Sequence, residues 1–208
     1  MGVCVDPETD HVSLRGREVT MSKRLVTVML HKPAGYVTTS RDQFGRPDVC
    51  QLVKIPGLRL YPVGRLDYQT TGLLLLTNDG ELTYRMTFPG FHMAKTYEAL
   101  LRGKVNEADL KPLEKGVKLE DGYRTAPAKA KVLRKEKENT WISLTIYEGK
   151  YHQVRRMAKA IKHPVLRLKR VQEGSLKLGN LPVGAYRELT EEELESLKND
   201  LQNKGKPV

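Results

Sequence analysis

The amino-acid sequence predicts an α+β fold, built on a mixed, mainly antiparallel β-sheet that helices flank. Short runs of β-branched, aromatic and leucine residues recur along the chain between glycine, proline and asparagine turns, and few segments have helical spacing. These helical segments do not alternate strictly with the strands, as a parallel α/β fold would require. With 208 residues, the chain can bury a core without disulfides or metal ions.

The front of the chain predicts little structure of its own. Residues 1–21 hold one short strand-like alternation, at 11–14, which is too little to fold alone. Residues 25–39 contain two β-rich runs, and the sequence Lys-Pro-Ala-Gly at 32–35 breaks them into a strand, a turn and a second strand. Residues 41–49 are expected to form an exposed loop.

The middle of the chain predicts three strands and a helix. The four leucines at 73–76 form a continuous apolar run that is typical of a buried strand, and Asn-Asp-Gly at 78–80 predicts a turn after it. Residues 94–105 alternate as a strand does, residues 106–115 have helical spacing, and residues 140–149 again favour a strand.

The last third predicts two helices around a strand. Residues 151–162 have one apolar face and one basic face, and Pro164 ends this helix. The alternation at 166–169 predicts a strand. Thr190 and Glu193 form a capping box, which predicts the start of the last helix.

The charge of the chain favours a polyanionic partner. Lys and Arg number 36 against 25 Asp and Glu, which makes the net charge +11. Residues 150–177 hold nine of these cations against one acid, Glu173, so most of the excess lies in one segment. Nucleic acids and anionic membranes are the partners that such a balance suits.

Several classes of chemistry have no support in the sequence. Cys4 and Cys50 are far apart and belong to no Cys-x-x-Cys pair, and the five histidines lack the spacing of metal ligands. Glycine-rich nucleotide motifs and the Gly-x-Ser-x-Gly motif are missing, so we expect no metal and no cofactor. No apolar run approaches the length of a membrane span or a secretion signal, and we expect a cytoplasmic monomer.

Two residues outside these motifs could carry chemistry. Asp67 follows Arg65 and Leu66 at the mouth of the leucine strand, where a carboxylate is costly to bury unless a cation pairs with it. Arg65 or an arginine of the basic helix could be that cation, and the pair could be structural, which is commoner, or could serve a nucleophile or base. Tyr97 could be a core residue or could stack on a nucleic-acid base.

Four stretches in order resemble a known family. They are "GRLDYQTTGLLLLTNDGEL", "KTYEALLRG", "EGKYHQVRRM" and "GAYRELTEEE". Together they resemble the motifs of the RsuA/RluB/RluE/RluF family of bacterial ribosomal RNA pseudouridine synthases, over nearly the whole chain. The resemblance implies the fold of a pseudouridine synthase catalytic domain. It also implies the isomerisation of a specific uridine of 16S or 23S ribosomal RNA, without a cofactor.

The resemblance also implies roles for individual residues. Asp67 would attack the flipped-out nucleotide at C1′ of the ribose or at C6 of the base, and Tyr97 would pack against that base and assist removal of the C5 proton. Arg155 would be the basic partner of Asp67, and Arg65 would fill the space that the nucleotide leaves. The residues expected to bind substrate are Arg65, Thr71, Lys95, Lys150, Val154, Arg156 and Lys159.

The front of the chain departs from the family pattern. Members of the family begin with an S4-type RNA-binding domain, and residues 1–21 resemble only its last hairpin, so residues 22–208 are expected to form the catalytic domain. The helices of the S4 domain would then be missing, which puts substrate choice in doubt. A transfer RNA pseudouridine synthase and a non-catalytic RNA-binding factor of ribosome assembly are the alternatives.

Overall fold

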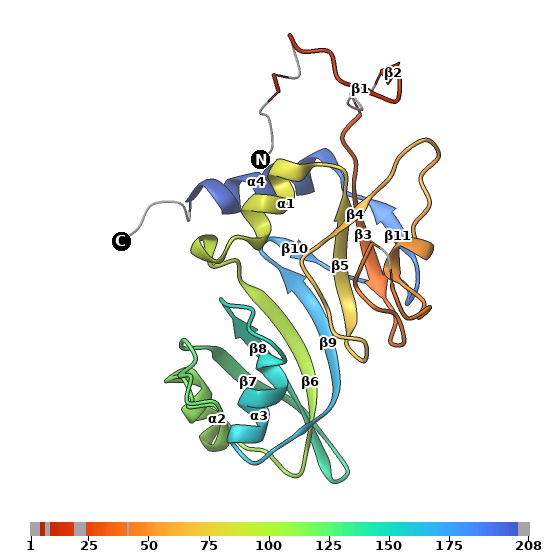
Figure 1. Cartoon of the computed structure of the whole chain (residues 1–208). Coiled ribbons are helices and arrows are strands. Elements are labelled where there is room, and N and C mark those ends of the chain that lie inside the picture. Colours follow the sequence, from red (N-terminus) through yellow and green to blue (C-terminus); the bar gives the residue numbers. More distant parts are fainter. Residues whose placement is uncertain (1–4, 7–8, 19–23, 41, 204–208) are drawn as a thin grey trace.

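The computed structural model describes residues 5–6, 9–18, 24–40 and 42–203, and nine strands of this part form one sheet (Figure 1). The strands are β3 (Thr27–Lys32), β4 (Tyr61–Val63), β5 (Thr71–Thr77), β6 (Lys95–Arg102), β7 (Lys129–Glu136), β8 (Asn139–Ile146), β9 (Val165–Glu173), β10 (Leu176–Lys177) and β11 (Tyr186–Glu188). Their order is β11-β3-β5-β9-β6-β8-β7, with β10 beside β9 and β4 beside β5.

The sheet is mixed and mainly antiparallel, as the sequence predicts. Among the described strands, β5 and β9 form the single parallel pair, with Gly72 opposite Arg170. A Cβ atom on Gly72 would lie 2.1 Å from the backbone oxygen of Arg170, and the φ angle of Gly72 is +114°. Only glycine therefore lets the two halves of the sheet meet at this point.

Helices cover both faces of the sheet. Helices α1 (Gly80–Thr87) and α4 (Glu191–Asn203) pack on the face that Leu73 and Leu75 present, and they lie together in Figure 1. Helices α2 (Glu107–Glu114) and α3 (Gln153–Ala160) belong to the second core cluster, which contains Leu74 and Leu76. Because side chains alternate along a strand, the four leucines supply both cores, which explains why the run is apolar without interruption.

Most of the expected elements are confirmed. Strands β3, β5, β6, β8 and β9 and helix α2 lie where the patterns predict them. The capping box before α4 is also present. Thr190 Oγ1 accepts a hydrogen bond from the Glu193 backbone N–H at 3.2 Å, and Glu193 accepts one from the Thr190 N–H at 3.0 Å.

Four expectations are wrong in detail. Residues 36–39 do not form a strand, and only Val37 makes an isolated bridge, to Asp48. The segment 78–80 is more than a turn, because the Asp79 side chain caps α1 by accepting from the Leu82 N–H. The loop expected at 41–49 is exposed at residues 43–47, whereas Asp42 is partly buried and Asp48 and Val49 are buried. Helix α3 begins at Gln153 rather than at residue 151.

The front of the described chain stands apart from the main sheet. Strands β1 (Ser13–Leu14) and β2 (Arg17–Glu18) pair only with each other, as a short antiparallel hairpin (Figure 1). The expected domain boundary at 21/22 and Cys4 lie outside the described residues, so the assignment of residues 1–21 to an S4 remnant stays a prediction. Within the described residues, the helices are too short or too polar to cross a membrane.

Candidate active site

A cleft of about 610 Å³ opens between the two halves of the sheet. Its walls come from the loop between β4 and β5, the end of α1, strands β6 and β9, and the loop before α3. Seven of the ten expected site residues line it, namely Arg65, Asp67, Lys95, Tyr97, Lys150, Val154 and Arg155. The fold therefore gathers these seven residues from three separate stretches of the sequence, at 65–67, 95–97 and 150–155.

Three expected site residues lie outside this lining. Thr71 belongs to β5, where its hydroxyl donates to the Leu168 backbone oxygen at 3.4 Å. Arg156 is held by an acidic pair, with its Nε 2.9 Å from Glu120 Oε1 and its guanidinium also paired with Asp121. Lys159 is exposed on α3.

Asp67 presents a partly exposed carboxylate to the cleft. Its side chain is 34% exposed, and its Oδ1 lies 3.7 Å from Nε2 of His152. The expected ion pair of Asp67 with Arg155 is not formed among the described residues, where the Arg155 guanidinium instead donates to Thr70 Oγ1 at 3.4 Å. Arg155 thus contacts the loop of Asp67 rather than its carboxylate.

His152 is a site residue that sequence reasoning missed. It has a left-handed backbone, with a φ angle of 50°, directly before the first residue of α3. Its ring stacks on Tyr151 with the centroids 3.8 Å apart. This conformation explains why α3 starts late, and the only available signal was the place of His152 inside the quoted motif "EGKYHQVRRM".

The backbone of the Asp67 loop is held from below by Lys32, which sequence reasoning also missed. The fully buried Nζ of Lys32 donates to the backbone oxygens of Asp67 at 3.2 Å and Thr70 at 3.0 Å, and also to those of Pro33 and Tyr68. Burial lowers the pKa of Lys32 to about 8, while the charge of Asp67 acts in the opposite direction. One ammonium group therefore fixes the loop that carries the acid.

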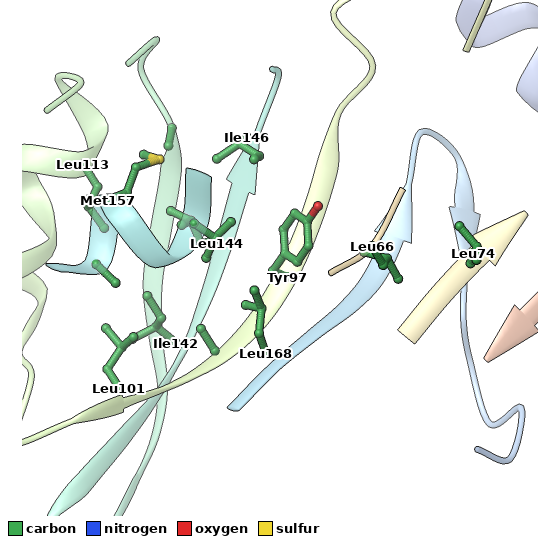
Figure 2. Packing of buried hydrophobic residues seen from close by; sticks show 14 of the residues in the cluster. Leu66, Leu74, Tyr97, Leu101, Leu113, Ile142, Leu144, Ile146, Met157 and Leu168 are labelled. Carbon is green, nitrogen blue, oxygen red and sulfur yellow. The ribbon is translucent and has the colours of Figure 1, made fainter. Parts of the chain in front are cut away.

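Tyr97 forms the apolar wall of the cleft. Figure 2 shows its ring between Leu66 on one side and Leu144 and Ile146 on the other, with Leu168 nearby. Burial raises the pKa of the Tyr97 hydroxyl above its ordinary value, and the positive charge of Arg170 opposes this shift. The hydroxyl is therefore neutral at physiological pH.

A buried ion pair lies under Tyr97 at the floor of the cleft. The side chains of Arg170 and Glu173 are 2% and 4% exposed, and Arg170 Nη2 lies 3.2 Å from Glu173 Oε2. Arg170 Nε also donates to the Leu73 backbone oxygen at 2.8 Å. In the sequence, Glu173 was visible only as the single acid of a basic segment. Its position near Tyr97 could not be predicted, because it depends on the register of β9 against β6, which sets Arg170 opposite Tyr97.

The opposite rim is braced by a carboxylate. Glu148 accepts hydrogen bonds from the Tyr123 hydroxyl at 2.6 Å and from the side chain of Gln153. Gln153 in turn accepts from the Lys150 backbone N–H at 2.8 Å, and the Lys150 ammonium lies 5.1 Å from the centre of the Tyr123 ring. This network orders the loop that brings Lys150 and His152 to the cleft.

The arrangement combines a carboxylate, an apolar wall and cations in one concave site. An aspartate carboxylate in such a position is chemically able to attack an electrophilic carbon. The wall of Tyr97, Leu66 and Val154 suits a flat heteroaromatic ring, and the cations at the rim suit phosphates. Among the described residues, no cluster of His, Cys, Asp and Glu could hold a metal ion.

Comparisons with known proteins agree with this geometry. Residues 26–160 match the family model of the RNA pseudouridylate synthases. The chain is 43% identical over 192 residues to the ribosomal large subunit pseudouridine synthase B of Bacillus subtilis, and the match covers 91% of this chain and 78% of that protein. It is 38% identical over 193 residues to the ribosomal small subunit pseudouridine synthase A of Vibrio cholerae, with 91% and 81% covered.

A solved structure resembles the whole fold. It is a crystal structure of a pseudouridylate synthase, with 37% sequence identity and a TM-score of 0.77, and the match covers 94% of this chain and 83% of that one. The family model covers well over half of the chain, including Asp67, Tyr97 and Arg155. The chain therefore belongs to the RNA pseudouridylate synthase family, and it is an isomerase of uridine in RNA.

Proposed function

We propose that this enzyme converts a specific uridine of ribosomal RNA to pseudouridine, with Asp67 as the nucleophile and without a cofactor. The observation that carries the proposal is the partly exposed carboxylate of Asp67 in a cleft whose wall is Tyr97 and Val154. The names of the two relatives above, one for each ribosomal subunit, support ribosomal RNA as the substrate. Such a substrate favours the cytoplasm as the place of action.

The reaction needs no electron carrier, because it is redox-neutral. Attack of Asp67 at C1′ would break the glycosidic bond to N1, whereas attack at C6 would add the carboxylate to the base first. Either route ends with a C5–C1′ bond in place of the N1–C1′ bond, while C5 loses a proton and N1 gains one. The bound base has to turn before it is rejoined, so the site must hold it without a tight set of polar contacts.

The surrounding residues have roles that fit this requirement. Tyr97 and Val154 would pack on the two faces of the uracil, since both line the cleft. Because its raised pKa keeps the Tyr97 hydroxyl protonated, we expect it to act as a hydrogen-bonding group at C5 rather than as a phenolate base. The exposed Arg65, beside Asp67 on the same loop, would fill the stack that the flipped nucleotide leaves.

The basic face outside the cleft would bind flanking phosphates. Lys150 lines the rim, and Lys159 is exposed one helical turn beyond Arg155. Arg156 would join them only by exchanging its pairs with Glu120 and Asp121 for phosphate.

The test is the pseudouridine formed on RNA transcripts. Wild-type protein is incubated with 16S, 23S and transfer RNA transcripts, and pseudouridine is mapped by carbodiimide-dependent stops of reverse transcription. We expect a new stop in one ribosomal transcript and no stop with Asp67→Asn, which keeps the shape of the side chain but lacks the charge. A stop that survives Asp67→Asn would refute the nucleophile, and stops in transfer RNA alone would refute the substrate.

RNA binding is measured with the same variants. Asp67→Asn should bind the transcript about as tightly as wild type does, because the phosphate-binding cations remain. If Lys159 binds a phosphate, Lys159→Ala should flatten the dependence of log K on log salt by roughly one unit. Binding without any stop on the three classes of RNA would favour a non-catalytic RNA-binding factor instead.

A further inference from the structure

An exposed aromatic cluster extends from the mouth of the cleft along α1. It consists of Tyr84, Phe88 and Phe91, the last in the short 3-10 helix η2 (Pro89–Phe91). The ring centres of Tyr84 and Phe88 are 5.4 Å apart, and those of Phe88 and Phe91 are 6.0 Å apart. Tyr84 is 60% exposed and Phe88 is 47% exposed, which is costly in water and marks a surface for binding.

The backbone holds Phe88 in one place. Its N–H donates to the Tyr84 backbone oxygen at 2.9 Å, and Pro89 keeps its backbone extended, with φ −66° and ψ 125°. The ring lies against Gly90, because a Cβ atom there would come within 2.7 Å of Phe88 Cε1. The absence of a side chain at Gly90 thus leaves the space that the Phe88 ring occupies.

Phe88 also belongs to the cleft that holds Asp67. Phe88, Pro89 and His92 line its outer part, and Arg65 and Lys95 line the same cavity. Arg65 is exposed, and Gly64 beside it lies against Thr87, where a Cβ atom would be 3.7 Å from Thr87 Cγ2. An apolar ring surface therefore meets positive charge where an RNA strand would enter.

We propose that this cluster binds the base of an unpaired nucleotide next to the target uridine, by stacking on Phe88 and Tyr84. The inference rests on the proposed function, since it requires an RNA substrate in the cleft. A uridine that leaves its stack exposes the neighbouring base, and an aromatic ring can replace the missing stacking with any base. The exposed Arg65 guanidinium in the same cleft favours RNA as the occupant over an apolar protein surface, because a phosphate is its complement in charge.

The test compares RNA affinity between matched variants. Dissociation constants are measured by fluorescence anisotropy on a uridine-containing single-stranded RNA, and on the same RNA with an abasic residue on either side of the uridine. Phe88→Leu, which keeps apolar surface but cannot stack, should weaken binding of the intact RNA roughly 5- to 150-fold, and Phe88→Trp should restore it. Tyr61→Leu is the control, because Tyr61 is a 43% exposed aromatic on β4 outside the cleft lining.

A second variant, Gly90→Ala, moves the Phe88 ring without removing it. Gly90→Ala has no strained backbone to overcome, and it should displace the Phe88 ring and weaken binding while the thermal midpoint stays close to that of wild type. With one of the two abasic RNAs, wild type and Phe88→Leu should bind equally, since the stacking partner is gone.

The outcomes separate this inference from the proposed function. Equal affinity of wild type and Phe88→Leu for the intact RNA would overturn the inference and leave the cluster as a surface for another partner. The same holds if the effect of Phe88→Leu persists unchanged on both abasic RNAs. A loss of affinity in Phe88→Leu, together with no pseudouridine formed by wild type on ribosomal transcripts, would refute the proposed function but support the stacking site.

Discussion

Removal of the buried carboxylate of Glu173 should destabilise the protein strongly. In Glu173→Leu the Arg170 guanidinium, 2% exposed, loses its partner at 3.2 Å and keeps only neutral groups such as the Leu73 backbone oxygen and the Tyr97 hydroxyl. Breaking a buried ion pair from one side costs about 3–5 kcal/mol, because the remaining charge has neither water nor a counter-charge. For a domain of this size, this corresponds to a fall of about 6–20 °C in the thermal midpoint.

A double variant tests whether the cost comes from the unpaired charge of Arg170. Arg170→Met combined with Glu173→Leu removes both charges from the same space, and it should recover most of the missing stability or exceed that of wild type. Thermal and urea unfolding of both single variants, the double variant and wild type measure the coupling between the two residues. Activity should remain low in the double variant despite its stability, because the Tyr97 hydroxyl no longer has the positive charge of Arg170 near it.

Two results would contradict this account. A cost below about 1 kcal/mol for Glu173→Leu would mean that the pair does not carry buried charge. Equal costs for the single and double variants would mean that the two side chains act independently of each other.

Other variants test the junction, the loop anchor and the tyrosine. Gly72→Ala should lower the free energy of unfolding, measured in urea, by more than about 3 kcal/mol, because its Cβ would lie 2.1 Å from the Arg170 backbone oxygen. In Gly64→Ala the new Cβ would lie 3.7 Å from Thr87 Cγ2, and the loss should be about 1–2 kcal/mol. Activity should fall as pH rises through about 8, because Lys32 then loses the proton with which it holds the Asp67 loop. The free energy of unfolding of wild type relative to Lys32→Met should instead rise from pH 8 to 10. Over this range the unfolded chain keeps the Lys32 proton that the folded chain releases. A difference that stays constant over this range would contradict the lowered pKa. Above pH 10, wild type should lose stability relative to Tyr97→Phe, because only the unfolded chain releases the tyrosine proton there. If the free energies of unfolding of the two proteins, measured in urea, change equally with pH, this prediction is refuted.

The local patterns of the sequence were sufficient for most strands and for the chemistry of the substrate. Four consecutive leucines predict a strand that is buried on both sides, and the spacing of Thr190 and Glu193 predicts a helix start, since both signals act within a few residues. The excess of Lys and Arg indicates a polyanion, and the ordered motifs indicate the family. Asp67, Tyr97 and Arg155 can therefore be named without knowledge of the fold.

Local ambiguity limited some of these predictions. Asn-Asp-Gly is favourable in a turn and equally favourable where an aspartate caps a helix, so α1 was missed. The aromatic residues of α1 have no periodic signal that separates an exposed cluster from a buried one. In Figure 1, α1 lies beside α4, on the face of the sheet that Leu73 and Leu75 present.

The sequence by itself determined five strands of the main sheet and the family, and it named Asp67 as the candidate acid. Only the tertiary structure decided what surrounds that acid. The Lys32 anchor, the His152 neighbour and the placement of Tyr97 opposite Arg170 all join segments that are far apart in the chain. These contacts depend on the register of β9 against β6 and on the parallel meeting of β5 and β9 at Gly72. Strand register is set by long-range packing of the whole sheet, which no short stretch of sequence encodes.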